Sequence, residues 1–198
     1  MQDPAPRDPY SSALGAVRRF ADAGRFVPGE PIVVTELAAE VGLSPTPVRE
    51  ALACLAGEGL IERRRGKGYF YPALGPSDII DLFELQLAYL HAALTLYPRG
   101  HASLRKAAVG VDPLDGVQAL YEAIITQSAN SALCLAHQRV SDRLLAVLRA
   151  ERAHDDSDGA TVKTMVAAIV EGDIPGLLAL VEAHHEHRCR RAPALDAG

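Results

Sequence analysis

The stretch VGLSPTPVREAL, residues 41–52, decides the fold of the N-terminal part, because it places two prolines at the start of a helix. Proline inside a helix costs about 3 kcal/mol, but the first turn tolerates it, since the N–H that proline lacks would have no intrahelical partner there. With Ser44 as N-cap, both prolines fall in that turn. The positive end of a rigidly started helix would then present Thr46 and Arg49 to an anion. An ordinary capped helix would have a similar sequence, so the neighbouring segments must show whether this helix is a binding element.

Those neighbours predict a winged helix-turn-helix arrangement. Residues 9–23 repeat apolar side chains at helical spacing and lead into a Gly/Pro turn. Thr35 can cap a second helix, ELAAEV, which Gly42 closes. The proline-started helix extends to about Gly57, and LIERRRGKGYFYP then forms two extended arms around a glycine turn, a pattern typical of a hairpin.

The apolar residues of the proline-started helix indicate which of its sides is buried. That side is formed at helical spacing by Val48, Ala51, Leu52 and Leu55. Thr46, Arg49 and Ala53 then point elsewhere and leave an open face of the kind that a recognition helix presents to DNA. Taken singly, a threonine, an arginine or a run such as RRR is often only a solvated surface. The combination of these residues with three helices and a hairpin, in this order along the chain, favours DNA binding.

Composition limits the class of protein. Hydrophobic residues make up 48% of the chain without a run of 18 apolar residues, which argues against a membrane-spanning protein, and the N-terminus lacks an apolar signal-peptide core. We therefore expect a cytoplasmic protein with no membrane partner. The cysteines, Cys54, Cys134 and Cys189, are three in number, widely spaced and without a CxxC pair, so reduced thiols are expected.

Charge is unevenly distributed along the chain. The net charge of −5 at first argues against a nucleic-acid partner. Residues 1–72, however, carry nine basic and nine acidic residues, so the whole deficit lies in the remainder. Because local fields govern DNA contact more than the total charge does, the acidic balance does not exclude a DNA-binding N-terminal part.

The segment PGEPIVVTELAAEVGLSPTPVREALACLAGEGLIERRRGKGYFY resembles the DNA-binding domain of the GntR family of bacterial transcription factors. The PGE turn, the ELA of the second helix, the S-x-T-P-V-R-E-A-L run, the EGL and the glycine-tipped wing fall in register over roughly residues 10–72. Where the family usually has arginine, this chain has Pro45, so its usual operator sequence is not expected. The resemblance implies that the following residues contact DNA: Thr35, Ser44, Thr46, Arg49, Arg65, Gly66 and Lys67.

The second part, residues 76–195, shows no strand pattern. Ser77 can cap a long amphipathic helix that Pro98 stops. Further helices are predicted at about 101–109, 113–128, 131–153, 160–171 and 174–191. Short connections between long helices predict an antiparallel all-α bundle. The fold expected for the chain is therefore mainly α, with a winged helix-turn-helix domain over 1–74 and a helical effector-binding and dimerisation domain over 75–198.

This bundle resembles, more weakly, the all-helical effector domain of the FadR-type subfamily, in a divergent form shortened by about one helix. The subfamily's first bundle helix normally carries Arg and Glu where this chain has Gln86 and Leu90. Many members hold a metal through one Asp and three His, and those positions fall on Val117, Tyr121, Val162 and His184. Two valines cannot ligate and a neutral tyrosine is a poor ligand, so neither a metal nor another cofactor is expected.

The same substitutions leave hydrogen-bonding groups in a more apolar pocket. We expect a less charged ligand than the small carboxylates of the metal-bearing relatives, or a vestigial pocket. If the alignment is shifted by one residue, His137 or His185 joins the site. The candidate effector-binding residues are therefore Tyr121, His137 and His184. His184 and His187, three residues apart, could form a metal pair, although a solvated end of a terminal helix is commoner.

No nucleophile and carboxylate set, P-loop or GxGxxG motif suggests an enzyme. The sequence predicts a regulator, expected to act as a repressor, that binds a palindromic operator in double-stranded DNA as a homodimer and senses an unidentified small molecule. The alternative is a metabolite-binding or scaffold helical protein whose winged helix mediates protein contacts.

Overall fold

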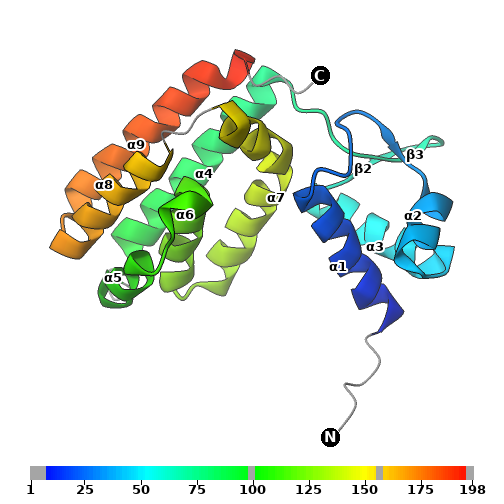
Figure 1. Ribbon diagram of the computed structural model, residues 1–198, viewed down its shortest axis with the longest axis horizontal. Helices are drawn as coiled ribbons and strands as arrows, with labels where there is room; N and C mark the ends of the chain where they lie inside the picture. The colour runs from blue at the N-terminus through cyan, green and yellow to red at the C-terminus, as the bar shows by residue number, and fades with distance from the viewer. Residues whose placement is uncertain (1–7, 98–100, 155–157, 195–198) are drawn as a thin grey trace, which may run out of the picture. The chain divides into compact units, whose positions relative to one another are not determined.

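The computed structural model describes residues 8–97, 101–154 and 158–194 (Figure 1). The chain divides into two compact units, one ending at Leu74 and one beginning at Gly75. The first unit combines helices with a small sheet and the second is helical, so the predicted fold class is confirmed. Pro98, the predicted end of the first bundle helix, lies outside the described residues.

The first unit is built from short elements in the order helix, strand, two helices, two strands. They are α1 (Pro9–Asp22), β1 (Pro31–Ile32), α2 (Val34–Val41), α3 (Pro45–Glu58), β2 (Glu62–Arg64) and β3 (Gly68–Phe70). Strand β3 lies between β1 and β2 and pairs antiparallel with both. The hairpin of β2 and β3 is the wing, with Arg63 opposite Tyr69.

The helix boundaries follow local chemistry, with one correction. Ser44 is the N-cap of α3, and Gly42 ends α2 in the left-handed region at φ 69°, both as predicted. Thr35 is not the cap of α2, because that helix begins one residue before it, with Val33 as N-cap. Strand pairing ends at Ile32, and the Val33 carbonyl already accepts the first helical hydrogen bond, from Leu37 N–H at 3.0 Å.

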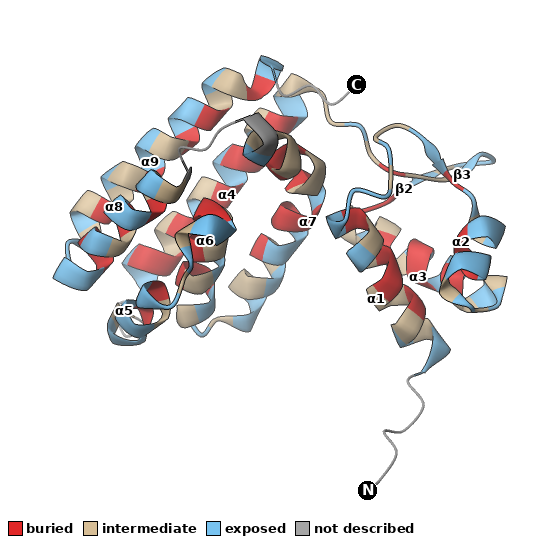
Figure 2. Cartoon of the chain, viewed as in Figure 1, coloured by how far each residue is buried: buried red, intermediate tan, exposed pale blue. Residues whose placement is uncertain are grey.

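The core of the first unit forms where α1, α2 and α3 meet. Its buried side chains are aliphatic, together with one tyrosine: Val17, Leu37, Val48, Leu52 and Leu55 on the helices, and Leu60 and Tyr71 in the segments between or after elements. Figure 2 shows the buried residues in red. An ion pair between Arg18 of α1 and Glu58 of α3 joins the two helices at the edge of this core. Helix α3 is therefore held by its apolar side and its last turn, which leaves the opposite side exposed.

The second unit consists of helices joined by short connections. They are α4 (Pro76–Leu96), α5 (His101–Val109), η2 (Pro113–Asp115), α6 (Gly116–Gln127), α7 (Ser131–His154), α8 (Asp158–Glu171), α9 (Ile174–Arg191) and η3 (Ala192–Ala194). Helix α4 contacts α6, α7 and α9, while α8 packs on α5, α6 and α9. The shared core contains Leu90, Leu120, Tyr121, Ile124, Val162, Met165, Leu177 and Val181.

The start of α4 differs from the prediction. Gly75, not Ser77, is the N-cap, and Pro76 occupies the first turn. The Gly75 N–H donates to Asp78 Oδ2 at 3.1 Å, so the aspartate three residues on satisfies the helix start. Ser77 lies one residue inside the helix.

Helix α4 is also the one candidate membrane span among the described helices, with a mean hydropathy of 1.3 over 18 residues. Length and composition alone give that result, and core helices of globular domains give it too. Here Ile79, Phe83, Leu90 and Leu94 are buried in the unit to which α4 belongs.

Candidate nucleic-acid interface and effector pocket

One side of α3 is exposed along its length. Thr46, Arg49 and Ala53 lie on it, as predicted, and Glu50 lies beside them. Val48 and Leu52 anchor the opposite side and are fully buried. Because Pro45 starts the helix in its first turn, Thr46 sits where main-chain N–H groups have no helical partner and an anion is favoured. Ser44 and Thr35, the other predicted contacts from helical segments, are both exposed.

The wing tip is a turn formed by Arg65, Gly66 and Lys67, all exposed. The Lys67 N–H donates to the Arg64 carbonyl at 3.0 Å and closes the turn. Gly66 has a φ of 74°, a conformation that favours glycine, and a side chain added there would meet no atom within 4 Å. Backbone geometry therefore accounts for the glycine, and an exposed cation precedes and follows it in the chain.

Arg64 behaves differently from its neighbours. Its guanidinium donates two hydrogen bonds to Glu62, at 2.8 and 2.9 Å, and lies 4.1 Å from the centroid of the Phe70 ring. The hydrogen bond from Arg64 lowers the pKa of the Glu62 carboxyl, and the same bond raises the pKa of Arg64. Arg64 is thus engaged within the wing, whereas Arg63 and Arg65 are exposed.

Helix α3 and the wing share one hollow. Arg49 lines it from α3, and the wing contributes Arg63, Arg64, Arg65, Gly66, Gly68 and Tyr69. The Tyr69 hydroxyl donates to the main-chain carbonyl of Arg49 at 3.4 Å. The structure therefore brings Arg49 and Arg65 to one surface and adds Arg63 and Tyr69, which the sequence analysis did not select.

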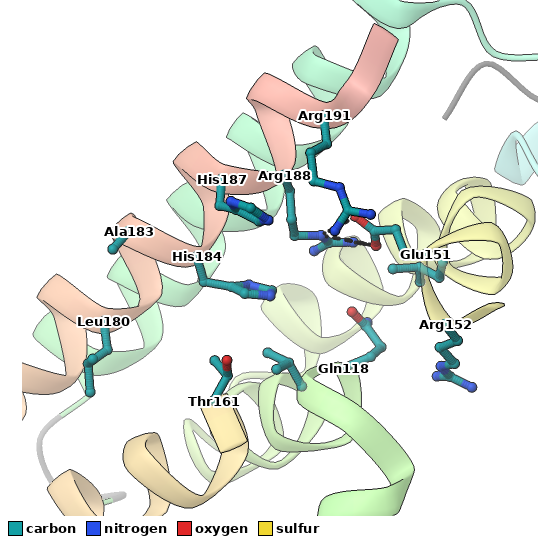
Figure 3. Close-up of a pocket in the computed structure, with 12 residues that line it drawn as sticks. Gln118, Glu151, Arg152, Thr161, Leu180, Ala183, His184, His187, Arg188 and Arg191 are labelled. Carbon is teal, nitrogen blue, oxygen red and sulfur yellow. Dashed lines mark hydrogen bonds and ion pairs between the residues drawn. The ribbon is translucent and has the colours of Figure 1, made fainter. Parts of the chain in front are cut away.

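The second unit contains a pocket of about 370 Å³ lined by residues of α6, α7, α8 and α9 (Figure 3). Its ionisable lining residues are Glu151, Arg152, His184, His187, Arg188 and Arg191. Apolar side chains, among them Val117 and Leu180, complete the lining. The lining is more cationic than predicted, because the prediction rested only on the positions of the relatives' metal ligands.

Arg188 is held from three directions. Its Nη2 and Nε donate to Glu151 at 2.7 and 3.0 Å, and its Nη1 donates to Gln86 Oε1 at 3.1 Å. The guanidinium also lies 3.9 Å from the centroid of the Phe83 ring. Gln86 in turn donates to Gln118 at 3.1 Å. This buried arginine ties α4 and α7 to α9, with its charge balanced by Glu151.

The positions aligned with the relatives' metal ligands do not fit a metal here. Val117 and Val162 are buried and carry no donor atom. Tyr121 and His184 lie together, and a 2.8 Å hydrogen bond between the tyrosine hydroxyl and His184 Nδ1 occupies that nitrogen. Among the residues that the structure describes, no group of three or more His, Cys, Asp or Glu could hold an ion.

Only His184 of the three predicted effector residues lines the pocket. Tyr121 is buried behind it, with its ring stacked on His185 at a centroid distance of 5.2 Å. His137 is buried as well, and neither it nor His185 has a hydrogen-bond partner for Nε2 among the described residues. Burial lowers the pKa of His137 to about 4 and, with smaller effects of nearby charges, that of His185 to about 3. Both are therefore neutral core side chains at pH 7.

The model of the gntR family of bacterial regulatory proteins matches residues 9–70, the segment that contains α1 to α3 and the wing. Residues 9–70 are a GntR-family helix-turn-helix domain. An HTH-type transcriptional regulator of Agrobacterium vitis is 28% identical over 176 residues, which are 89% of this chain and 76% of that protein. The Nta operon transcriptional regulator of Aminobacter aminovorans is 41% identical over 71 residues, 36% of this chain and 34% of that protein.

Two solved structures have the same fold over most of this chain. McbR/YncC of E. coli has a TM-score of 0.70 at 18% identity and covers 93% of this chain and 97% of its own. A GntR regulator of Rhodococcus sp. RHA1 has a TM-score of 0.72 at 17% identity, with 92% and 96% covered. The match of residues 9–70 to the gntR family, together with the regulators of similar sequence, confirms the predicted function class, a DNA-binding regulator.

Proposed function

We propose that this chain is a cytoplasmic, FadR-like transcription regulator that binds a palindromic operator as a homodimer and represses transcription until its helical unit binds a small molecule. The GntR-family domain supplies DNA binding. Operator symmetry, dimer formation, repression and effector sensing are the parts that the proposal adds. In it, Thr35, Ser44, Thr46 and Arg49 contact DNA from the helices, and Arg65, Gly66 and Lys67 contact it from the wing.

The observation that carries the proposal is the hollow shared by α3 and the wing. Arg49 projects from the exposed side of α3, and Arg63 and Arg65 reach the same hollow from the wing. Among the described residues these three arginines have no acidic partner, whereas Arg64 pairs with Glu62. Exposed guanidinium groups beside the positive start of a helix suit the phosphates and guanine edges of a duplex.

A homodimer follows from the amount of sequence that one winged helix can read. A single recognition helix contacts few base pairs, whereas a two-fold dimer reads two half-sites of a palindrome. The exposed Leu85 of α4 and Leu135 of α7 give the helical unit apolar surface for such a contact. Sedimentation should give a dimer at micromolar concentration; a monomer both alone and on DNA would contradict this part of the proposal.

The test of DNA binding is fluorescence anisotropy on duplexes that contain palindromes from upstream of the gene itself. Contacts to several phosphates release counterions, so we expect affinity for one palindrome to fall steeply with salt. A scrambled duplex of equal length is the control, and its affinity should be at least about tenfold lower. Equal affinity for every duplex, or no binding at low salt, would favour a helical protein that uses its winged helix for protein contacts.

A further inference from the structure

The first unit has a second hollow, a groove of about 440 Å³ between residues 25–33 and helix α2. Among the described residues of this unit, Val27 and Val33 are the large apolar side chains that are exposed, at 62% and 44%, and both line the groove. The buried side chains of Ile32 and Leu37 continue the apolar lining. A contiguous apolar surface that a folded domain leaves exposed marks a site of interaction.

The rim of this groove is acidic. Glu30, Glu36 and Glu40 line it, together with one basic residue, Arg25. The Arg25 side chain pairs with Glu40 at 3.3 Å. Glu30 and Glu36 are exposed and have no basic partner among the described residues. The groove therefore has an excess of negative charge at pH 7.

The fold accounts for one of the two unpaired carboxylates. Glu36 lies in the first turn of α2, where an acidic side chain interacts favourably with the helix dipole. Glu30 lies directly before β1 and outside any helix. Its main-chain N–H donates to the Val27 carbonyl and its carbonyl accepts from the Tyr71 N–H, both at 3.1 Å. Local structure thus uses the backbone of Glu30 and leaves its carboxylate exposed on the groove.

The groove and the hollow shared by α3 and the wing lie at opposite edges of the sheet. Strand β1 forms one edge and contributes Pro31 and Ile32 to the groove. Strand β2 forms the other edge and contributes Arg63 to the hollow. One edge is therefore apolar and acidic, and the other is cationic. The acidic rim would repel a nucleic acid or an anionic lipid surface from the groove.

The charge and shape of the groove limit what can occupy it. A metal ion does not fit, since no group of three or more His, Cys, Asp or Glu among the described residues could hold one. Glu36 and Glu40 lie one turn apart on α2, and Glu30 lies on the other segment that lines the groove. An apolar centre within a charged rim is the arrangement of a protein–protein contact, and opposite charge across such a contact selects the partner.

We infer that the groove is a docking site for a cationic segment of another protein. An apolar side chain of that segment packs against Val27 and Val33, and its Lys or Arg side chains meet Glu30 and Glu36. None of the residues proposed to contact DNA lines the groove. The inference therefore goes beyond the proposed function, and it adds a protein partner on the unit that binds DNA.

The experiment is a titration of the isotopically labelled full chain with short capped peptides, followed through its backbone amide NMR shifts. The probe is Lys-Arg-Leu-Leu-Lys-Arg. One control has Gly in place of both Leu, and the other has Glu in place of every Lys and Arg. We expect the probe to shift the amides of residues 25–40 and to bind about tenfold more tightly than either control, because leucine buries apolar surface and the cations match the rim. Equal binding of the glycine peptide, or no shift in residues 25–40 at up to about 1 mM probe, would overturn the inference.

Variants then locate the site. Val27→Ser removes exposed apolar surface, and the double variant Glu30→Gln with Glu36→Gln removes the unpaired charges. Each of these two proteins should bind the probe about fivefold more weakly. Glu50→Gln is the matched control, because Glu50 is an exposed glutamate of the same unit outside the groove, and this variant should keep the affinity of the unchanged chain. An equal loss in Glu50→Gln would show a general attraction between opposite charges and overturn the site.

Sedimentation separates a partner protein from a second copy of this chain. If a second copy filled the groove, Val27→Ser would lower the sedimentation coefficient of the free chain, and that result would overturn the inference. We expect Val27→Ser to leave both this coefficient and operator affinity unchanged. Loss of operator binding with intact peptide binding would overturn only the proposed function, whereas operator binding without peptide binding would overturn only this inference.

Discussion

The Tyr69 hydroxyl, on strand β3 of the wing, donates a hydrogen bond of 3.4 Å to the main-chain carbonyl of Arg49 in helix α3. It joins the wing to the helix at the hollow that both line. A main-chain acceptor makes this link independent of the Arg49 side chain, so wing position and arginine chemistry can be tested separately.

Tyr69→Phe removes that bond and keeps the ring. The bond is long and exposed, so we expect affinity for the operator to fall only about threefold, from the low end of the usual range for a hydrogen bond. Thermal unfolding should change little. Anisotropy at fixed salt measures the first quantity and circular dichroism the second. Unchanged operator affinity would show that the wing does not depend on Tyr69 for its position.

Arg49→Ala should cost about 1–3 kcal/mol of operator affinity if Arg49 reads a base, with relaxed preference at that position of the operator. If Arg49 holds a phosphate, the loss should be the same for every sequence. Arg19→Ala is the matched control, because Arg19 is an exposed arginine of α1 outside the shared hollow. Operator affinity that Arg49→Ala leaves intact would contradict the assignment of α3 as recognition helix.

The wing should contribute affinity with little base discrimination. Arg65 and Lys67 flank Gly66 at the tip, where the backbone can approach a duplex closely. Replacing both cations with Ala should reduce the slope of log affinity against log salt by about one to two. Titrations of the variant and the unchanged chain on one duplex measure the difference. The same slope in both would show that the wing tip does not contact phosphates.

Sequence patterns predicted the elements of the winged helix because the signals there are local. Ser44 with two prolines and Gly42 in a left-handed conformation fix the start of α3 and the end of α2 by their own chemistry. Thr35 and Ser77 were wrongly predicted as caps because several residues near each helix start could serve. Strand β1 ends at Ile32, which lets α2 begin before Thr35. The side chain of Asp78 accepts from the Gly75 N–H, which makes Gly75 and not Ser77 the cap of α4.

The cationic pocket could be predicted only in part. The spacing from Leu180 to Arg191 is visible in the sequence and indicates one helix face. Whether that face meets solvent or other helices depends on the packing of α6, α7 and α8 against α9, as does the pairing of Arg188 with Glu151. The pocket residues that the sequence did not predict can therefore be identified only from contacts between helices that are distant in the chain.

The helical unit should lose stability in mild acid. Burial lowers the pKa of His137 to about 4 and that of His185 to about 3, against 6.5 for an ordinary histidine. At a pH between 6.5 and the lowered pKa of each histidine, the unfolded chain binds more protons than the folded chain. The contribution of these histidines to the free energy of unfolding is therefore fully present above about pH 6.5 and is lost as the pH falls. Each histidine adds up to about 1.4 kcal/mol per pH unit to the slope of the free energy of unfolding against pH.

His137→Leu should therefore flatten the dependence of unfolding free energy on pH between 6.5 and about 4, whatever its effect on absolute stability. His187→Gln is the control, because His187 is exposed and that variant should keep the slope of the unchanged chain. Urea unfolding at several pH values gives the slopes. Equal slopes in the unchanged chain and His137→Leu would mean that His137 is protonated in the folded unit at these pH values.

Protein purified without chelator should contain no stoichiometric transition metal. Val117 and Val162 have no donor atom, and Tyr121 already occupies His184 Nδ1 at 2.8 Å, so three converging ligands are not available at these positions. Elemental analysis measures this directly. Near-stoichiometric zinc, nickel or manganese that is lost on His184→Ala would contradict it.

A gain-of-binding variant tests the same alignment in the opposite direction. The substitutions Val117→Asp, Tyr121→His and Val162→His together supply the ligand types that the metal-bearing relatives use. If the positions correspond, this triple variant should bind zinc, raise its thermal midpoint when zinc is added, and lose both effects on His184→Ala. A triple variant that folds yet takes up no zinc would show that the four positions do not converge as a metal site requires.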